Sequence, residues 1–224
     1  MSALCAITDD FSGKPAILVL GDSHADQLTD VLADLGRTFS VPVYYSTKQC
    51  SLGHFGPGDW CSVQTFDSIL HEAKWKNVVE VLSIRLFRID REDVVLFRQN
   101  VRTVLAADFH LTIMENVPTA EHFDPTERAL RAMKDGSISY TGLPVEKHSA
   151  SMAEYRQLLS ALVREHPGQV STITPEPLIC PSSVCEFATD GRPNYFDWNH
   201  LTQTGARRVM PVFEPIFRRV ARGD

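Results

Sequence analysis

The sequence has no long hydrophobic run and no cluster of positive charge. Its longest uninterrupted apolar stretches have the length of a β-strand, so none of them can cross a bilayer. The start of the chain has neither the positive charge nor the apolar core of a signal peptide, since Met1 leads into polar Thr8, Asp9 and Asp10. With a net charge of -6, binding to a nucleic-acid backbone is not expected. The chain is therefore either cytoplasmic or a piece of a longer exported or membrane-tethered protein.

The five cysteines lack the closely spaced Cys-x2-Cys knuckles that zinc sites favour. Cys50 and Cys61 form one pair and Cys180 and Cys185 another, each in an irregular segment that follows a predicted strand. We expect two disulfides, which indicate an oxidising compartment. Free thiols and a zinc site of four sulfurs are the alternatives. Cys5 is left over.

Most of the histidines also lack the spacing of metal ligands. We assign no role to His54, His71, His110, His122, His148 and His166. We therefore expect no metal in this chain.

Predicted strands alternate with predicted helices along the chain. Apolar runs predict strands at 16–20, 41–46, 77–84, 109–115 and 169–174, and periodic apolar positions predict helices at 22–36, 62–75, 91–107, 151–166 and 201–221. The less regular residues 116–150 are expected to form a long excursion over one face. This order predicts an α/β, doubly wound domain with a mostly parallel sheet and flanking helices. At 224 residues the chain suits one domain, assigned to 15–224, with 1–14 as a linker or N-terminal extension.

Residues 21–25, Gly-Asp-Ser-His-Ala, directly follow the first predicted buried strand. Sites in doubly wound sheets lie beyond the carboxyl ends of the strands, which favours Ser23 as a functional residue. The alternative is that Asp22 and Ser23 only cap the following helix. Adjacent residues on a helix point in different directions, so His24 is not expected to act as the base for Ser23. We assign to His24 a local hydrogen bond or a contact with an acceptor molecule.

Residues 197–201, Asp-Trp-Asn-His-Leu, precede the last predicted helix. Asp197 and His200 can both reach one site, and with Ser23 they supply a nucleophile, a base and a group that orients the base. The alternative is that Asp197 or Asn199 only caps the final helix. The predicted topology returns this helix to the carboxyl edge of the sheet, beside the first strand-to-helix turn, which favours the catalytic interpretation.

Together the two motifs resemble those of the SGNH-type hydrolases and transferases. The chain is particularly similar, over about residues 15–217, to the extracytoplasmic domain fused to bacterial membrane acyltransferases. Further matching segments are the Cys50 loop, Leu82-Ser83-Ile84-Arg85, Cys180…Cys185, and residues 195–201 followed by Gly205-Ala206. The resemblance implies a flavodoxin-like three-layer sandwich that forms the catalytic part of a longer membrane protein.

The resemblance also implies a function. Ser23 matches the nucleophile, His200 the general base and Asp197 the residue that orients the base. Such domains O-acylate, usually O-acetylate, a cell-envelope glycan such as lipopolysaccharide O-antigen or peptidoglycan. The fused membrane domain would deliver the acyl group, no cofactor is expected, and the domain would be periplasmic and tethered to the inner membrane.

The chain departs from the family after the third predicted strand, where SGNH enzymes carry a Gly-x-Asn-Asp block. Arg85 stands at the matching place, either as an oxyanion or acceptor-binding group or as part of an ordinary ion pair. The backbone N–H of Gly53 is a candidate second oxyanion donor. Candidates for stacking on a sugar ring are Trp60, Tyr195 and Trp198, with a place in the core as the alternative for each. Two alternatives for the whole chain are an esterase with the same triad and a glycan-binding module without turnover.

Overall fold

The computed structural model describes residues 3–9, 11, 13–46, 50–53, 61–87, 94–119 and 142–223. At its centre is a six-stranded sheet with the order β1-β3-β2-β4-β5-β7. The strands are β1 (Leu4–Ala6), β2 (Ala16–Gly21), β3 (Val43–Ser46), β4 (Val78–Ile84), β5 (His110–Met114) and β7 (Val170–Ile173). Neighbours pair in parallel except β1, which pairs antiparallel with β3. The predicted doubly wound, mostly parallel sheet is confirmed.

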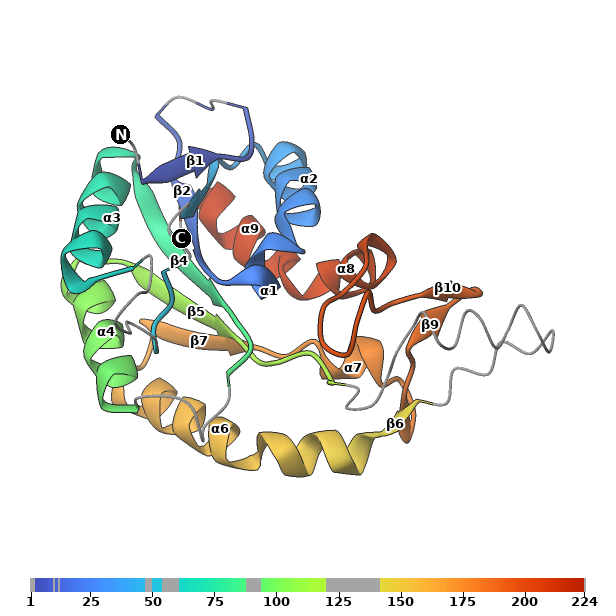
Figure 1. Cartoon of the computed structure of the whole chain (residues 1–224). Helices are drawn as coiled ribbons and strands as arrows, with labels where there is room; N and C mark the ends of the chain where they lie inside the picture. The colour runs from blue at the N-terminus through green and yellow to red at the C-terminus, as the bar shows by residue number, and fades with distance from the viewer. Residues whose placement is uncertain are drawn as a thin grey trace.

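Helices cover both faces of this sheet, which makes three layers (Figure 1). Strand β2 is buried throughout, and its alternate residues serve two cores, because successive side chains of a strand point to opposite faces. Ile17 and Val19 pack in one core, and Leu18 and Leu20 in the other. The first core is closed by α2 (Thr29–Phe39), α8 (Gln203–Val209) and α9 (Glu214–Arg222), and the second by α3 (Val63–Trp75), α4 (Val94–Ala106) and α6 (Val145–Glu165).

The helix predicted at 22–36 is two helices, α1 (Ser23–Asp26) and α2. The hydroxyl of Thr29 donates to the carbonyl of Asp26 at 2.8 Å, a local bond that competes with regular helix pairing. The sequence predicted that this helix ends at Gly36, but α2 continues to Phe39. A Cβ at Gly36 would lie 2.8 Å from the Val41 carbonyl oxygen, so this glycine allows close packing instead.

The closing helix predicted at 201–221 is also divided, into α8, a 3₁₀ turn at Met210–Val212, and α9. Pro211 and Pro215 lie near the starts of the second and third pieces. Proline has no N–H for the helical hydrogen bond and clashes with the preceding turn, so each piece must begin anew.

The helix predicted at 151–166 begins earlier, as α6 follows directly on Pro144. The final part of the predicted excursion at 116–150 is therefore helical, and residues 120–141 of it lie outside the described residues. Short elements that the sequence did not predict follow β7: α7 (Glu176–Ile179), β8 (Val184–Cys185), β9 (Ala188–Thr189) and β10 (Arg192–Pro193). Strand β8 pairs with β6 (Leu143–Pro144).

The N-terminal segment contributes to the domain through β1, and the backbone N–H of Ile7 also donates to Val43 at 3.0 Å. Within the segment predicted to be a linker or N-terminal extension, residues 4–6 thus form an edge strand. Both expected disulfides form, Cys50–Cys61 and Cys180–Cys185, and Cys5 is a free, exposed cysteine.

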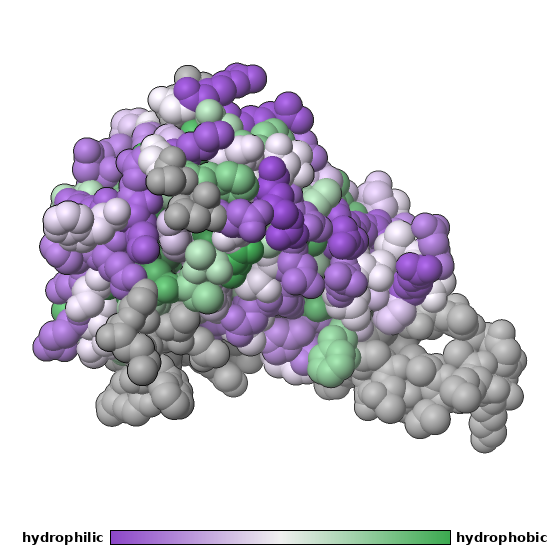
Figure 2. All heavy atoms as spheres, turned by 90° about the horizontal axis from the view of Figure 1, so that it is seen from above, coloured by the Kyte–Doolittle hydropathy of each residue, from purple (hydrophilic) through white to green (hydrophobic). Residues whose placement is uncertain are grey.

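The surface on the side where β1 lies is mostly hydrophilic, with a small group of hydrophobic side chains near the middle of that face (Figure 2). None of the helices in the described ranges has both the length and the apolar character needed to cross a membrane.

Candidate active site

Ser23 lies in the tight turn between β2 and α1, at the carboxyl edge of the sheet. A Cβ at Gly21 would lie 1.9 Å from the Ile84 carbonyl oxygen, so only glycine allows β2 to end this close to β4. Asp22 then caps α1, because its Oδ1 accepts a hydrogen bond from the His24 backbone N–H at 2.9 Å. This turn leaves Ser23 exposed at the first position of α1.

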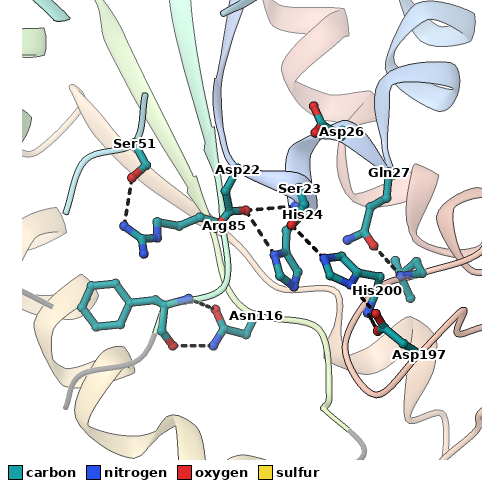
Figure 3. Close-up of polar contacts among 12 residues, drawn as sticks. Asp22, Ser23, His24, Asp26, Gln27, Ser51, Arg85, Asn116, Asp197 and His200 are labelled. Carbon is teal, nitrogen blue, oxygen red and sulfur yellow. Dashed lines mark hydrogen bonds and ion pairs between the residues drawn. The ribbon is translucent and has the colours of Figure 1, made fainter. Parts of the chain in front are cut away.

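Ser23, His200 and Asp197 form a continuous chain of hydrogen bonds (Figure 3). The distance from Ser23 Oγ to His200 Nε2 is 2.8 Å, and that from His200 Nδ1 to Asp197 Oδ2 is 2.7 Å. A carboxylate only accepts hydrogen bonds, so Nδ1 of His200 carries the proton and Nε2 presents its lone pair to the serine hydroxyl. The arrangement is that of a nucleophile, a base and a group that orients the base.

The loop that carries His200 is held on several sides. Tyr195 and Leu201 form an antiparallel bridge, and the backbone N–H of Phe196 donates to His200 at 2.8 Å. The backbone N–H of Leu201 donates to the side-chain oxygen of Gln27, which ties the loop to the segment between α1 and α2. The position of His200 relative to Ser23 is therefore fixed by hydrogen bonds of the loop backbone as well as by the bond between the two side chains.

Asp197 is held in its charged form. Burial by itself raises the pKa of Asp197, but hydrogen bonds from the backbone N–H of Asn199 and from the His200 side chain and backbone outweigh that effect. The two backbone bonds to Oδ1 measure 2.9 and 2.7 Å. The pKa of Asp197 consequently lies below its ordinary value, and the carboxylate is ionised beside the imidazole at neutral pH.

His24 forms a second imidazole–carboxylate pair next to the first. Its Nδ1 lies 3.1 Å from Oδ1 of Asp22, and its ring stacks on His200 with centroids 4.5 Å apart and an interplanar angle of 24°. Burial raises the pKa of Asp22, but the bonds from His24 and the positive charge of Arg85 outweigh it, and the pKa ends below its ordinary value. His24 thus bonds to Asp22 and stacks on the base.

The sequence matches one known protein family. The model of the family described as SGNH domain (fused to AT3 domains) matches residues 2–215. The chain belongs to this family. No curated protein matches the sequence of this SGNH domain at a significant level.

Among solved structures, the SGNH domain is similar to the periplasmic domain of a lipopolysaccharide acetyltransferase from Salmonella ser. Paratyphi A. The TM-score is 0.68 at 16% identity, over 92% of this chain and 84% of the other. A putative acylhydrolase from Bacteroides fragilis aligns with a TM-score of 0.49 at 11% identity, over 93% and 91% of the two chains. A GDSL-like lipase from Bacteroides thetaiotaomicron has the same score and identity, over 91% and 88%. At this identity, the similarity to the Salmonella domain shows a shared fold.

Arg85 begins the loop after β4, and its Nη1 donates to Ser51 Oγ at 2.9 Å. Its guanidinium therefore extends toward the segment that carries Cys50, on the side of Asp22 away from His200 (Figure 3). Gly53 is buried in the same segment, and no hydrogen bond within the described residues joins it to Ser23. The roles of Arg85 and Gly53 at the oxyanion stay predictions.

The aromatic candidates for sugar binding differ in their exposure. Trp198 is 39% exposed in the loop between Asp197 and Asn199, where a ligand can reach it. Tyr195 is a core residue and not a sugar-stacking one, because its side chain is fully buried and packs edge-on against Phe187. Trp60 lies outside the described residues.

One supporting residue of the SGNH domain, Gln27, was missed by sequence reasoning. Gln27 binds the loop of His200, and its position four residues after Ser23, on the same helical side, is a signal that could have revealed it. Asn116 exchanges two 2.8 Å hydrogen bonds with the backbone of Phe87 and so fixes the loop after Arg85. Nothing in the spacing of Asn116 along the chain indicates that contact.

In the described part of the chain, no group of three or more His, Cys, Asp or Glu side chains is placed so that it could hold a metal ion. The polar groups at the carboxyl edge of the sheet are instead paired with one another by hydrogen bonds. The hydrogen-bonded arrangement at this edge is one that can activate the hydroxyl of Ser23.

Proposed function

We propose that this SGNH domain is a serine-dependent O-acyltransferase, with acetyl as the acyl group and a bacterial cell-envelope polysaccharide as the acceptor. The observation that carries the proposal is the hydrogen-bonded chain from Asp197 through His200 to Ser23. Membership of a family fused to AT3 domains supports acyl transfer, and lipopolysaccharide O-antigen or peptidoglycan would be the acceptor. Similarity to the Salmonella domain supports a periplasmic location, with the tethering membrane domain delivering the acyl group and no other cofactor.

In the first step, Ser23 Oγ attacks the carbonyl carbon of the acyl donor. His200 Nε2 takes the serine proton and passes it to the leaving group, while the Asp197 carboxylate stabilises the imidazolium. The backbone N–H of Ser23, with Gly53 or Arg85, would donate to the oxyanion. The product is an ester between the acyl group and Ser23.

In the second step, a hydroxyl of the acceptor glycan attacks the acyl-serine. Its proton goes to His200 Nε2 and then to Ser23 Oγ, which leaves as the bond to the acyl carbon breaks. The side chains of Trp198 and His24 would contact the acceptor. The free serine is regenerated and the glycan carries the new ester.

An esterase with the same triad is the second candidate, favoured by the exposure of Ser23, which gives water access to the acyl-serine. A glycan-binding module without turnover has no need of the complete hydrogen-bonded triad and is the weakest interpretation.

The test is an acyl-transfer assay with an aryl acetate as donor. Purified O-polysaccharide and peptidoglycan fragments serve as acceptors, with O-acetyl groups detected by NMR spectroscopy for the native protein and Ser23→Ala. Ser23-dependent acetylation of either glycan would support the transferase. Ester hydrolysis with no glycan acetylated would favour the esterase, and glycan binding without either reaction would favour the binding module.

A further inference from the structure

The Nε2 atom of His24 is buried and has no hydrogen-bond partner in the described part of the chain. His24 as a whole is only 7% exposed. A buried polar atom without a partner is costly, and a hydrocarbon ring at this position would avoid the cost. Packing alone therefore does not explain why this position holds a histidine.

The chemical nature of this nitrogen follows from its neighbours. Nδ1 of His24 lies beside the Asp22 carboxylate, which only accepts hydrogen bonds, so Nδ1 carries the proton. A ring that carries this single proton has an acceptor at Nε2. The neutral form also suits the reaction, because His200 becomes positive when it takes the serine proton, and a second stacked cation 4.5 Å away would repel it.

The position of the ring indicates which ligand group the nitrogen meets. His24 stacks on His200, whose Nε2 must receive the proton of the attacking acceptor hydroxyl. Adjacent hydroxyls of a sugar ring lie within hydrogen-bond distance of each other. When one hydroxyl occupies the base, its neighbour is thus brought toward the adjoining imidazole.

We propose that His24 Nε2 accepts a hydrogen bond from the hydroxyl adjacent to the one that attacks, so that the site selects acceptors with a vicinal diol. This inference rests on the proposed acyl transfer and specifies its acceptor. The attacking hydroxyl gives its proton to His200 and forms the bond to the acyl carbon, whereas the adjacent hydroxyl keeps its proton and only donates to His24. Because Nε2 is covered in the unliganded domain, binding must open a small gap beside it, and the expected preference is modest.

The experiment compares two acceptors of equal ring size, cis-cyclohexane-1,2-diol and cyclohexanol, with 4-nitrophenyl acetate as donor. The native domain should acetylate the diol about tenfold more efficiently, as expected for one hydrogen bond. In His24→Phe, which keeps a flat ring and removes the nitrogen, the ratio between the two acceptors should fall to about one. His110→Phe, at an exposed histidine on β5, should keep the native ratio.

The rates with the two acceptors are compared as a ratio, because a general disturbance of the site lowers both rates by the same factor and leaves the ratio unchanged. An equal rate for both acceptors in the native domain, or an unchanged preference in His24→Phe, would overturn the role of His24 and leave the acyltransferase proposal intact. If the native domain acetylates neither acceptor and forms no acyl-serine, the proposed function itself fails.

A second measurement needs no turnover. In Ser23→Ala protein labelled with ¹⁵N-histidine, the diol should shift the Nε2 resonance of His24 and cyclohexanol should not. The same spectrum reports whether Nδ1 of His24 carries the proton. If the Nε2 resonance of His24 does not shift at a saturating concentration of the diol, the inference is contradicted, even if His24→Phe fails to fold.

Discussion

At the scale of single residues, the sequence predicted Ser23, Asp197 and His200 together, and the structure joins them by hydrogen bonds. Both motifs sit next to strong signals of secondary structure, the buried strand before Ser23 and the helix after His200. The contact of Arg85 with Ser51 was not predictable, because the two residues lie 34 positions apart and no sequence pattern links them. The sequence left open whether Tyr195 lines the site or belongs to the core, because an aromatic residue in a loop has no periodic pattern.

Removal of the triad side chains should separate their roles. We expect Ser23→Ala and His200→Ala to lower kcat/KM for 4-nitrophenyl acetate by about 10⁴-fold or more, because the nucleophile or its base is lost. Asp197→Ala should keep measurable residual activity, since His200 can still act as a base when it is poorly oriented. Ser68→Ala, at an exposed serine on α3, is the matched control. Native activity in Ser23→Ala or His200→Ala would contradict the assignment.

Arg85 and Ser51 should act as a pair. Arg85→Ala and Ser51→Ala each remove the same 2.9 Å hydrogen bond, so their effects on the free energy of unfolding should not add. A double-mutant cycle from urea unfolding should give a coupling of about 1 kcal/mol. Additive effects would show that the bond contributes nothing to stability.

At the scale of elements, the strands matched their predicted positions better than the helices did. Strands of a parallel sheet are buried on both faces and read as continuous apolar runs, as in β2. Helix breaks depend on single contacts, such as that of Thr29 with Asp26, which the sequence does not reveal. The breaks at Pro211 and Pro215 could have been predicted, because proline ends helical pairing wherever it occurs.

The disulfide between Cys180 and Cys185 joins α7 to β8, in the segment that leads to Asp197. Replacing both cysteines by serine should lower the free energy of unfolding by about 2 kcal/mol, because the unfolded chain gains freedom. It should also lower esterase activity, since the loop of Asp197 loses one of its supports. Cys5→Ser, at a free exposed cysteine, is the control. Native activity in the double variant would show that the loop is held without the disulfide.

At the scale of the whole molecule, charged residues from distant segments meet near the carboxyl edge of the sheet. Arg156 on α6 bonds to Glu115 after β5 at 2.8 Å and to Glu176 on α7 at 2.7 Å. Nε2 of His148 lies 3.6 Å from Glu176, and its side chain is 2% exposed. The sequence did not predict this cluster, because only the folded topology brings the three segments together.

Burial lowers the pKa of His148 to about 4, and the charge of Arg156 adds to this, while Glu176 acts in the opposite direction. Above the ordinary pKa of about 6.5 the ring is neutral in both folded and unfolded chains. As the pH falls below that value, His148 binds a proton in the unfolded chain but stays neutral in the folded one. This difference should lower the free energy of unfolding by about 2 kcal/mol between pH 7 and pH 5.

Urea unfolding of the native domain and of His148→Leu across this pH range checks the effect. The variant should lose most of the slope, whereas His110→Leu, at an exposed histidine, should keep it. Burial raises the pKa of Glu176, but hydrogen bonds and the charge of Arg156 hold it below its ordinary value, so its own titration affects stability at lower pH. An identical slope in His148→Leu would contradict the assignment.

The central claim is that Ser23 forms a covalent acyl intermediate on its way to a glycan. Intact-protein mass spectrometry after brief incubation with 4-nitrophenyl acetate measures this most directly, with peptide mapping to locate the adduct. We predict one acetyl group on the peptide that contains Ser23, absent from Ser23→Ala, which disappears when acceptor glycan is added and reappears on the glycan. An adduct of equal abundance in Ser23→Ala, or ester consumption that persists in that variant, would contradict the account.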